Sequence, residues 1–205
     1  MSAATTQTEP GTATPPAVLA FDYDGVIADS LEYFLRAFLG ACRHHGYLQL
    51  RARNDFLAMF DTNMYDGMVR AGVAPEAVQP ILRTMAESLE SSEKGYALFD
   101  GMGEVLRELS DAAPLYVVTS NVGSVVEAHL RERGLTCFRD ILGGDIDTSK
   151  SAKIRVLKGR YPQARLFYVG DTVGDMLEAR EAGAVPSRSR GGGTAANTSQ
   201  GPALT

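Results

Sequence analysis

Four short apolar segments, each followed by polar residues and then by a helical pattern, constrain the fold of this chain most. They predict strands over residues 18–24, 115–118, 138–142 and 166–169. The segment at 115–118 is apolar throughout, which is typical of parallel strands buried on both faces. Strands and helices that alternate in this way form a parallel sheet with right-handed crossovers. The sequence therefore predicts an α/β fold, a Rossmann-like parallel sheet with helices on both faces.

The stretch between the first and second strands is too long for a single crossover. Residues 31–94 carry helical patterns with no clear strand. We read them as a small inserted helical cap domain, and residues 17–30 together with 95–186 as the core domain. Residues 95–103 are punctuated by glycine and are expected to form the linker that returns to the core.

The predicted cap says little about a substrate. Four methionines could line a cleft, but methionine is more often a filler of cores, and we favour that interpretation. These residues are Met59, Met64, Met68 and Met85. Asn63, Tyr65 and Arg70 are polar candidates for substrate contacts, although nothing in the sequence singles them out.

Both ends of the chain have the composition of disordered segments. Residues 1–16 lack the positive start and apolar centre of a signal peptide, so we expect a disordered leader. A fifth strand should begin near residue 184, but residues 187–205 are of low complexity and are expected to be a disordered tail. Either the fold ends there or a natural C-terminal strand has been lost or replaced.

Charge and composition exclude several classes of function. The net charge is -5 and no basic stripe is visible, which argues against binding to nucleic acid. No apolar run approaches the roughly 18 residues of a membrane span. Cys42 and Cys137 show no metal or redox spacing, which favours reduced thiols in the cytoplasm. We expect a monomer or a small homo-oligomer whose partner is a small molecule.

Two carboxylates end the first predicted strand. Asp22 and Asp24 are two residues apart, so they point to the same side of the strand. Like charges this close resist joint ionisation unless a cation or a shared proton is present. The pair therefore indicates a metal, a shared proton or both, whereas the simpler alternative is an Asx turn at Asp24-Gly25.

Polar groups also follow the other predicted strands. Thr119 follows the second, Lys150 and Lys153 follow the third, and Asp171 follows the fourth, with Asp175 four residues later. The carboxyl ends of parallel strands share one edge, where ligands bind. Oxygen ligands suit magnesium, and a lysine with backbone amides can hold phosphate oxygens. The sequence therefore predicts a magnesium and phosphate site at this edge.

Simpler roles are open for three of these residues. Thr119 could only make an ST turn, Asp175 could cap its helix, and Lys153 could be a solvated charge. For Asp175 we favour a dual role. Between the two lysines we favour Lys150, because it lies just before the predicted helix and nearer the loop.

The four polar segments together resemble the haloacid dehalogenase-like (HAD) superfamily of phosphohydrolases. FDYDGVIADS is similar to its first motif, VVTSN to the second, a lysine near Ser149 to the third and VGDTVGD to the fourth. The resemblance covers residues 17–186. The insertion after the first motif is similar to the helical-cap branch, which includes phosphoglycolate phosphatase and β-phosphoglucomutase.

That resemblance implies roles for individual residues. Asp22 would be the nucleophile that forms an aspartyl-phosphate, and Asp24 the general acid and base. Thr119 would hydrogen-bond the phosphoryl group, and Lys150 would offset the charge of Asp22 and the phosphate.

The resemblance also implies a set of ligands. Asp171 would bind Mg²⁺ together with Asp22 and the backbone carbonyl of Asp24, and Asp175 would support the metal. The expected phosphate-binding residues are Gly25, Thr119, Ser120, Asn121, Lys150 and Lys153.

The sequence thus predicts a magnesium-dependent phosphatase acting on a small phosphorylated metabolite. A phosphomutase of the β-phosphoglucomutase type and a catalytically silent HAD-like protein with a disrupted C-terminus are the alternatives. A dehalogenase is disfavoured, because the dehalogenases of this superfamily lack the second aspartate of the first motif, which is Asp24 here.

Overall fold

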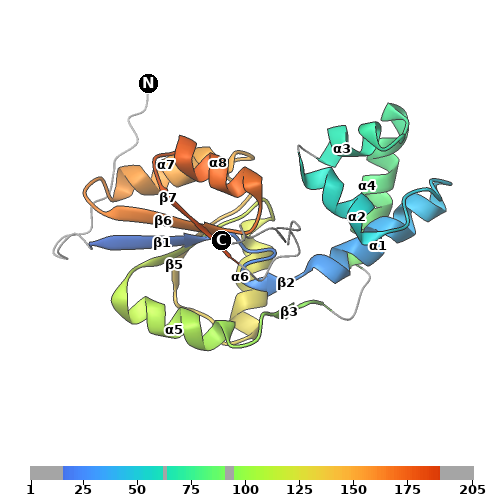
Figure 1. Cartoon of the computed structure of the whole chain (residues 1–205). Helices are drawn as coiled ribbons and strands as arrows, with labels where there is room; N and C mark the ends of the chain where they lie inside the picture. The colour runs from blue at the N-terminus through green and yellow to red at the C-terminus, as the bar shows by residue number, and fades with distance from the viewer. Residues whose placement is uncertain (1–15, 62–63, 91–94, 190–205) are drawn as a thin grey trace, which may run out of the picture.

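A five-stranded parallel sheet forms the centre of the molecule in a computed structural model, which describes residues 16–61, 64–90 and 95–189 (Figure 1). The strand order is β5-β4-β1-β6-β7, and every neighbouring pair is parallel. The strands are β1 (Ala17–Phe21), β4 (Leu115–Val118), β5 (Phe138–Leu142), β6 (Arg165–Gly170) and β7 (Val185–Arg188). The predicted α/β fold is confirmed.

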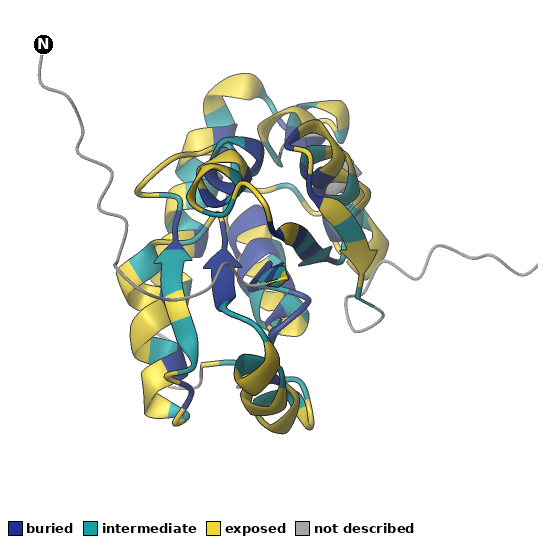
Figure 2. Ribbon diagram, turned by 90° about the vertical axis from the view of Figure 1, so that its left-hand side faces the viewer, coloured by how far each residue is buried: buried dark blue, intermediate teal, exposed yellow. Residues whose placement is uncertain are grey.

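Two pairs of helices cover the two faces of the sheet. α7 (Lys150–Arg160) and α8 (Val173–Glu181) lie on one face, and α5 (Met102–Ala112) and α6 (Gly123–Glu132) lie on the other (Figure 1). Alternation along the strands supplies a core to each layer. Figure 2 colours the buried residues dark blue, and they include residues of the central strands. Thus Val18 of β1 packs in the α7–α8 layer, whereas Phe21 packs in the α5–α6 layer.

A helical insertion lies to one side of the sheet (Figure 1). Its elements are α1 (Leu31–His44), α2 (Arg53–Leu57), the 3-10 helix η1 (Ala58–Asp61), α3 (Met64–Arg70) and α4 (Pro75–Glu90). The helices share an apolar cluster of their own, separate from the two layers of the sheet, and Phe38, Met59 and Ile81 are buried in it.

The chain enters and leaves this insertion through two adjacent short strands. β2 (Ala28–Asp29) pairs antiparallel with β3 (Ala97–Leu98). Residues 95–103 were expected to be only a linker, and the part of this linker at Ala97–Leu98 is instead a strand. Two residues are too few to show an alternating pattern, so the sequence carried no signal for this ladder.

Two predicted boundaries are wrong. The first strand ends at Phe21 rather than at residue 24, so both aspartates lie in the loop after β1. The predicted tail begins too early, because Ser187 and Arg188 belong to β7 and pair with Val169 and Gly170. β7 is a mostly exposed edge strand, so it needs no apolar run and tolerates Pro186.

Other predictions concern residues outside the described ranges: most of the leader (1–15), Asn63 and the tail from 190 onward. None of the helices in the described ranges combines the length and the apolar character that a membrane span requires.

Candidate active site

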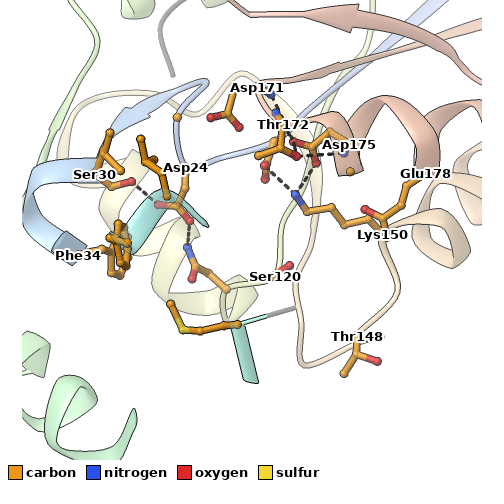
Figure 3. Close-up of a pocket in the computed structure, with 18 of the residues that line it drawn as sticks. Asp24, Ser30, Phe34, Ser120, Thr148, Lys150, Asp171, Thr172, Asp175 and Glu178 are labelled. Atoms are coloured by element: carbon orange, nitrogen blue, oxygen red, sulfur yellow. Dashed lines mark hydrogen bonds and ion pairs between the residues drawn. The ribbon is translucent and has the colours of Figure 1, made fainter. Parts of the chain in front are cut away.

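The carboxyl edge of the sheet faces the helical insertion across a pocket of about 450 Å³ (Figure 3). The floor of the pocket comes from the loops after β1, β4, β5 and β6 and from the beginnings of α7 and α8. The opposite wall comes from the insertion, whose η1 lies close to α8. The site is therefore built between two parts of the chain that fold around separate cores.

Asp22 lies at the bottom of this pocket with both carboxylate oxygens engaged. Its Oδ1 accepts the backbone N–H of Tyr23 at 2.8 Å, and its Oδ2 accepts the Lys150 ammonium at 2.7 Å. Burial raises the pKa of Asp22 to about 7, with Asp175 adding to the rise and Lys150 opposing it. The side chain is thus fixed in orientation and lies in a region of excess negative charge.

Asp24 is held by different partners on the side of the pocket near the insertion. Ser30 Oγ donates to one of its oxygens at 2.7 Å, and Asn121 Nδ2 donates to the other at 2.6 Å. Burial raises the pKa of Asp24, although both hydrogen bonds act in the opposite direction. The intervening Tyr23 is fully buried in the α5–α6 layer, so the chain alternates here as the sequence predicted.

Three carboxylates form a group that suits a divalent cation. Oxygen atoms of Asp22, Asp171 and Asp175 all lie within 4.8 Å of one another. Burial, reinforced by Asp175, raises the pKa of Asp171 to about 6. Lys150 supplies a single positive charge against three carboxylates, so two further positive charges would balance the group. Carboxylates are hard oxygen donors of the kind that bind Mg²⁺, which usually takes one or two of them and keeps several waters.

Asp175 combines a place in this group with a structural role. Its Oδ2 accepts from the backbone N–H of Thr172 at 3.1 Å, while Thr172 Oγ1 accepts from the backbone N–H of Asp175 at 3.0 Å. The two residues thus form a capping box at the start of α8. Lys150 donates to its Oδ1 at 2.7 Å. Burial alone would raise the pKa of Asp175, but Lys150 and Thr172 lower it overall.

Two glycines make room for the carboxylates. Gly25 has φ +72°, and a Cβ there would lie 2.3 Å from Oδ2 of Asp171. A Cβ on Gly170 would lie 2.4 Å from the Cβ of Asp175. Side chains at either position would displace an acidic group, so these glycines allow the loops after β1 and β6 to approach. Gly25 was predicted to bind phosphate, and it does line the pocket.

The two candidate lysines have different surroundings. Lys150 bridges Asp22 and Asp175 at the pocket (Figure 3). Lys153 is 1% exposed and donates to the backbone carbonyls of Thr119, Gly143 and Asp147 at 2.6–3.2 Å. The structure therefore does not bring Lys153 to the predicted phosphate site. Its ammonium instead joins the loops after β4 and β5.

The segment after β4 reaches the pocket with two of its three predicted residues. Ser120 and Asn121 line it. Thr119 is fully buried and is not among the described lining residues, and its hydroxyl accepts the backbone N–H of Asn121 at 3.1 Å. Thr119 thus makes the local turn that the sequence left open as its simpler role.

Several residues of the pocket were not identified from the sequence. Ser30, which holds Asp24, was part of the quoted first motif, and its hydroxyl was the available signal. Thr148, Thr172 and Glu178 also line the pocket.

The sequence identified even less of the helical wall, which is the side of the pocket that the insertion forms. It consists of Leu31, Phe34, Phe56, Leu57, Met64 and Met85. The four methionines do belong to or pack against the core of the insertion, as predicted, and two of them, Met64 and Met85, also line the pocket. Tyr65 and Arg70 are not among the described lining residues.

A family model described as haloacid dehalogenase-like hydrolase matches residues 19–185. Curated relatives named tyrosine-protein kinase PtkA, from Mycobacterium tuberculosis and Mycobacterium bovis, are 29% identical over 171 residues. The match covers 78% of this chain, and the chain spans only 57% of the length of these relatives.

Solved structures share the fold. A haloacid dehalogenase-like hydrolase from Streptococcus pneumoniae superposes with a TM-score of 0.71 at 22% identity, covering 84% of this chain and 83% of that one. The structure of PtkA from Mycobacterium tuberculosis has a TM-score of 0.70 at 24% identity, covering 95% and 93%.

Proposed function

The chain belongs to the haloacid dehalogenase-like hydrolase family, and on that premise we propose that it is a magnesium-dependent phosphatase. Its substrate would be a small phosphorylated metabolite, hydrolysed through an aspartyl-phosphate on Asp22. One observation carries this proposal: two neighbouring carboxylates have separate sets of partners. Asp22 is held against an ammonium, whereas Asp24 is held by a hydroxyl and an amide. Different surroundings of this kind assign different roles to two acids in one site.

Asp22 is suited to attack phosphorus. Its orientation is fixed by Tyr23 N–H and Lys150, and the Lys150 ammonium offsets charge repulsion between the carboxylate and the phosphate. The attack forms a bond from a carboxylate oxygen of Asp22 to phosphorus and breaks the bond from phosphorus to the ester oxygen.

Asp24 is suited to move the protons of both steps. Because burial raises its pKa, it can hold a proton and give it to the departing alcohol oxygen. In the second step the ionised Asp24 takes a proton from water as that water attacks the phosphorus of the aspartyl-phosphate. Inorganic phosphate leaves, and both carboxylates return to their starting states.

Asp22 and Asp171 would hold Mg²⁺, with the backbone carbonyl of Asp24 as a further ligand. Asp175 would support the ion from its position in the capping box. When bound, the cation supplies positive charge that screens the phosphate from the surrounding carboxylates. The excess of carboxylates over ammonium groups in the floor supports this assignment.

The test is phosphate release from an aryl phosphate by the whole chain. We expect release that requires Mg²⁺, stops with EDTA and resumes when Mg²⁺ is restored. Asp22→Asn should abolish it, because an amide is a poor nucleophile. Asp140→Asn is the matched control, since Asp140 lies on β5, pairs with Arg160 and does not line the pocket. Full activity in Asp22→Asn would contradict the mechanism.

A second candidate is transfer of the phosphoryl group to a tyrosine hydroxyl. The name of the curated relatives favours it, since they are called tyrosine-protein kinases. Incubation with γ-labelled ATP separates the two candidates. Label on a protein tyrosine would favour the transferase, and label only in free phosphate would favour the phosphatase.

We also propose a cytoplasmic location. Cys42 and Cys137 are both free, and burial raises the pKa of both thiols, as suits unreactive cysteines in a reducing compartment. Fractionation of cells that express the whole chain would test this.

A further inference from the structure

Resting on the proposed phosphatase function, we infer that the alcohol part of the substrate is uncharged and apolar, such as an aryl or branched alkyl group. The inference concerns the part of the substrate beyond the phosphate, which must lie between the floor of the pocket and the helical wall. Carboxylated, sugar and bisphosphate substrates are the alternatives that it disfavours.

Among the residues that the structure describes, the helical wall presents only apolar side chains to the pocket. Every described residue that the insertion contributes to the lining is aliphatic, aromatic or a thioether: Leu31, Phe34, Phe56, Leu57, Met64 and Met85. Hydroxyl groups of a sugar placed against this wall would lose hydrogen bonds to water and gain none. An apolar group would instead contribute favourable burial.

The charges of the pocket also disfavour a second anion. Its described lining contains the five carboxylates of Asp22, Asp24, Asp171, Asp175 and Glu178. Lys150 is the one cationic side chain in that lining, and its ammonium already contacts two carboxylates. The charge of a divalent ion would already be balanced by the carboxylates of the floor and by the phosphate. A carboxylate on the alcohol would therefore have no positive partner within the lining.

The wall is held in place by aromatic packing. The ring of Phe34 lies 5.9 Å from that of Tyr96 and 5.7 Å from that of Tyr33, measured between centroids. Phe56 lies 5.2 Å from Phe38 in the core of the insertion. An apolar group can therefore bind to a surface that is already formed, so little ordering is required.

A matched pair of substrates tests the inference. Phenyl phosphate and 4-carboxyphenyl phosphate differ by one carboxylate at the far end of the ring, which changes the basicity of the leaving phenolate little. With the whole chain and saturating Mg²⁺, we expect kcat/KM to be roughly tenfold or more lower for the carboxylated substrate, because its charge is buried without a partner. Equal values for the two substrates would overturn the inference and leave the phosphatase proposal standing.

A variant of the wall sharpens the test. Leu57 is half-buried at the end of α2, and Leu57→Arg places a cation where we expect the alcohol part to lie. We expect it to reverse the preference or to reduce it at least threefold, whereas Leu57→Met, which keeps the wall apolar, should keep it. Leu31→Arg is the second variant if Leu57→Arg does not fold. Unchanged preference in a folded arginine variant would contradict the inference, and hydrolysis of neither substrate would overturn it together with the phosphatase proposal.

Discussion

The floor and the wall of the pocket are built on opposite principles. The floor consists of carboxylates fixed by hydrogen bonds: Asp22, Asp24 and Asp175 each accept at least two. The wall consists of apolar side chains from four helices that share a core of their own. If the proposed function holds, the edge of the sheet would set the chemistry and the insertion would set the choice of substrate. The insertion could change its lining without disturbing the floor, because the two cores are separate.

Replacing Lys150 should have the largest effect on activity. If the replacement changed substrate binding alone, it would contradict the division between a floor that sets the chemistry and a wall that sets the choice of substrate. Lys150→Met removes the ammonium that contacts Asp22 and Asp175. We expect kcat to fall roughly 10²–10³-fold, as when a group that stabilises transition-state charge is lost. Steady-state kinetics with phenyl phosphate would measure it.

The matched control for this change is Lys158→Met on the same helix, because Lys158 does not line the pocket. A Lys150 variant that raised KM but kept kcat would mean that the floor also selects the substrate.

Removing the metal should show how far the floor depends on a cation. The pKa of Asp22 in the folded protein, about 7, exceeds its ordinary value of 3.8, chiefly because of burial. The folded state thus binds a proton that the unfolded state has released, so the free energy of unfolding should fall as the pH rises from about 4 to 7. Without Mg²⁺ we expect the melting temperature to drop by about 5 °C or more between pH 5 and 8.

Melting curves of wild type and Asp22→Asn, each with EDTA and with Mg²⁺, would isolate this contribution from other titrating groups. Mg²⁺ should restore the wild type most at pH 8, where the carboxylates are ionised. If the wild type lost no more stability between pH 5 and 8 than Asp22→Asn does, ionisation of Asp22 would not destabilise the metal-free protein. That result would contradict the prediction.

Shortening one side chain of the wall should have the smallest effect. Met64→Ala removes apolar contact with the substrate, and we expect KM for phenyl phosphate to rise roughly tenfold with little change in kcat. Tyr65→Ala is the control, because the neighbouring Tyr65 is exposed and does not line the pocket. A fall in kcat with constant KM would mean that Met64 affects the chemical step. It would contradict the division between the floor and the wall.

The floor was largely predictable from the sequence, whereas the wall was not. The apolar strands that come directly before Asp22 and Asp171 share one edge by the rules of parallel sheets, so the meeting of these two residues followed from their positions after the strands. The methionines show the opposite case. All four belong to or pack against the apolar cluster of the insertion, as predicted, but Met64 and Met85 also line the pocket. Helical periodicity identifies an apolar face without saying whether it meets a core or a ligand.

Contacts between distant loops also could not be predicted from the sequence. Lys153 was expected near phosphate because it follows the third strand, but its three acceptors are backbone carbonyls of two loops, those after β4 and β5. Every residue has a carbonyl, so no pattern marks these three. β7 was missed for a related reason: an edge strand with exposed side chains has the composition of a loop.

The paired strands β2 and β3 limit how the pocket can open. They are the two crossings between the sheet and the insertion, and they are bonded to each other, so they cannot separate without losing those bonds. A rotation of the whole insertion about an axis along the paired strands would preserve these bonds. The substrate would then enter, and the alcohol would leave, by the same rotation of the insertion. The angle of that rotation would determine how well the proposed aspartyl-phosphate is shielded from bulk solvent.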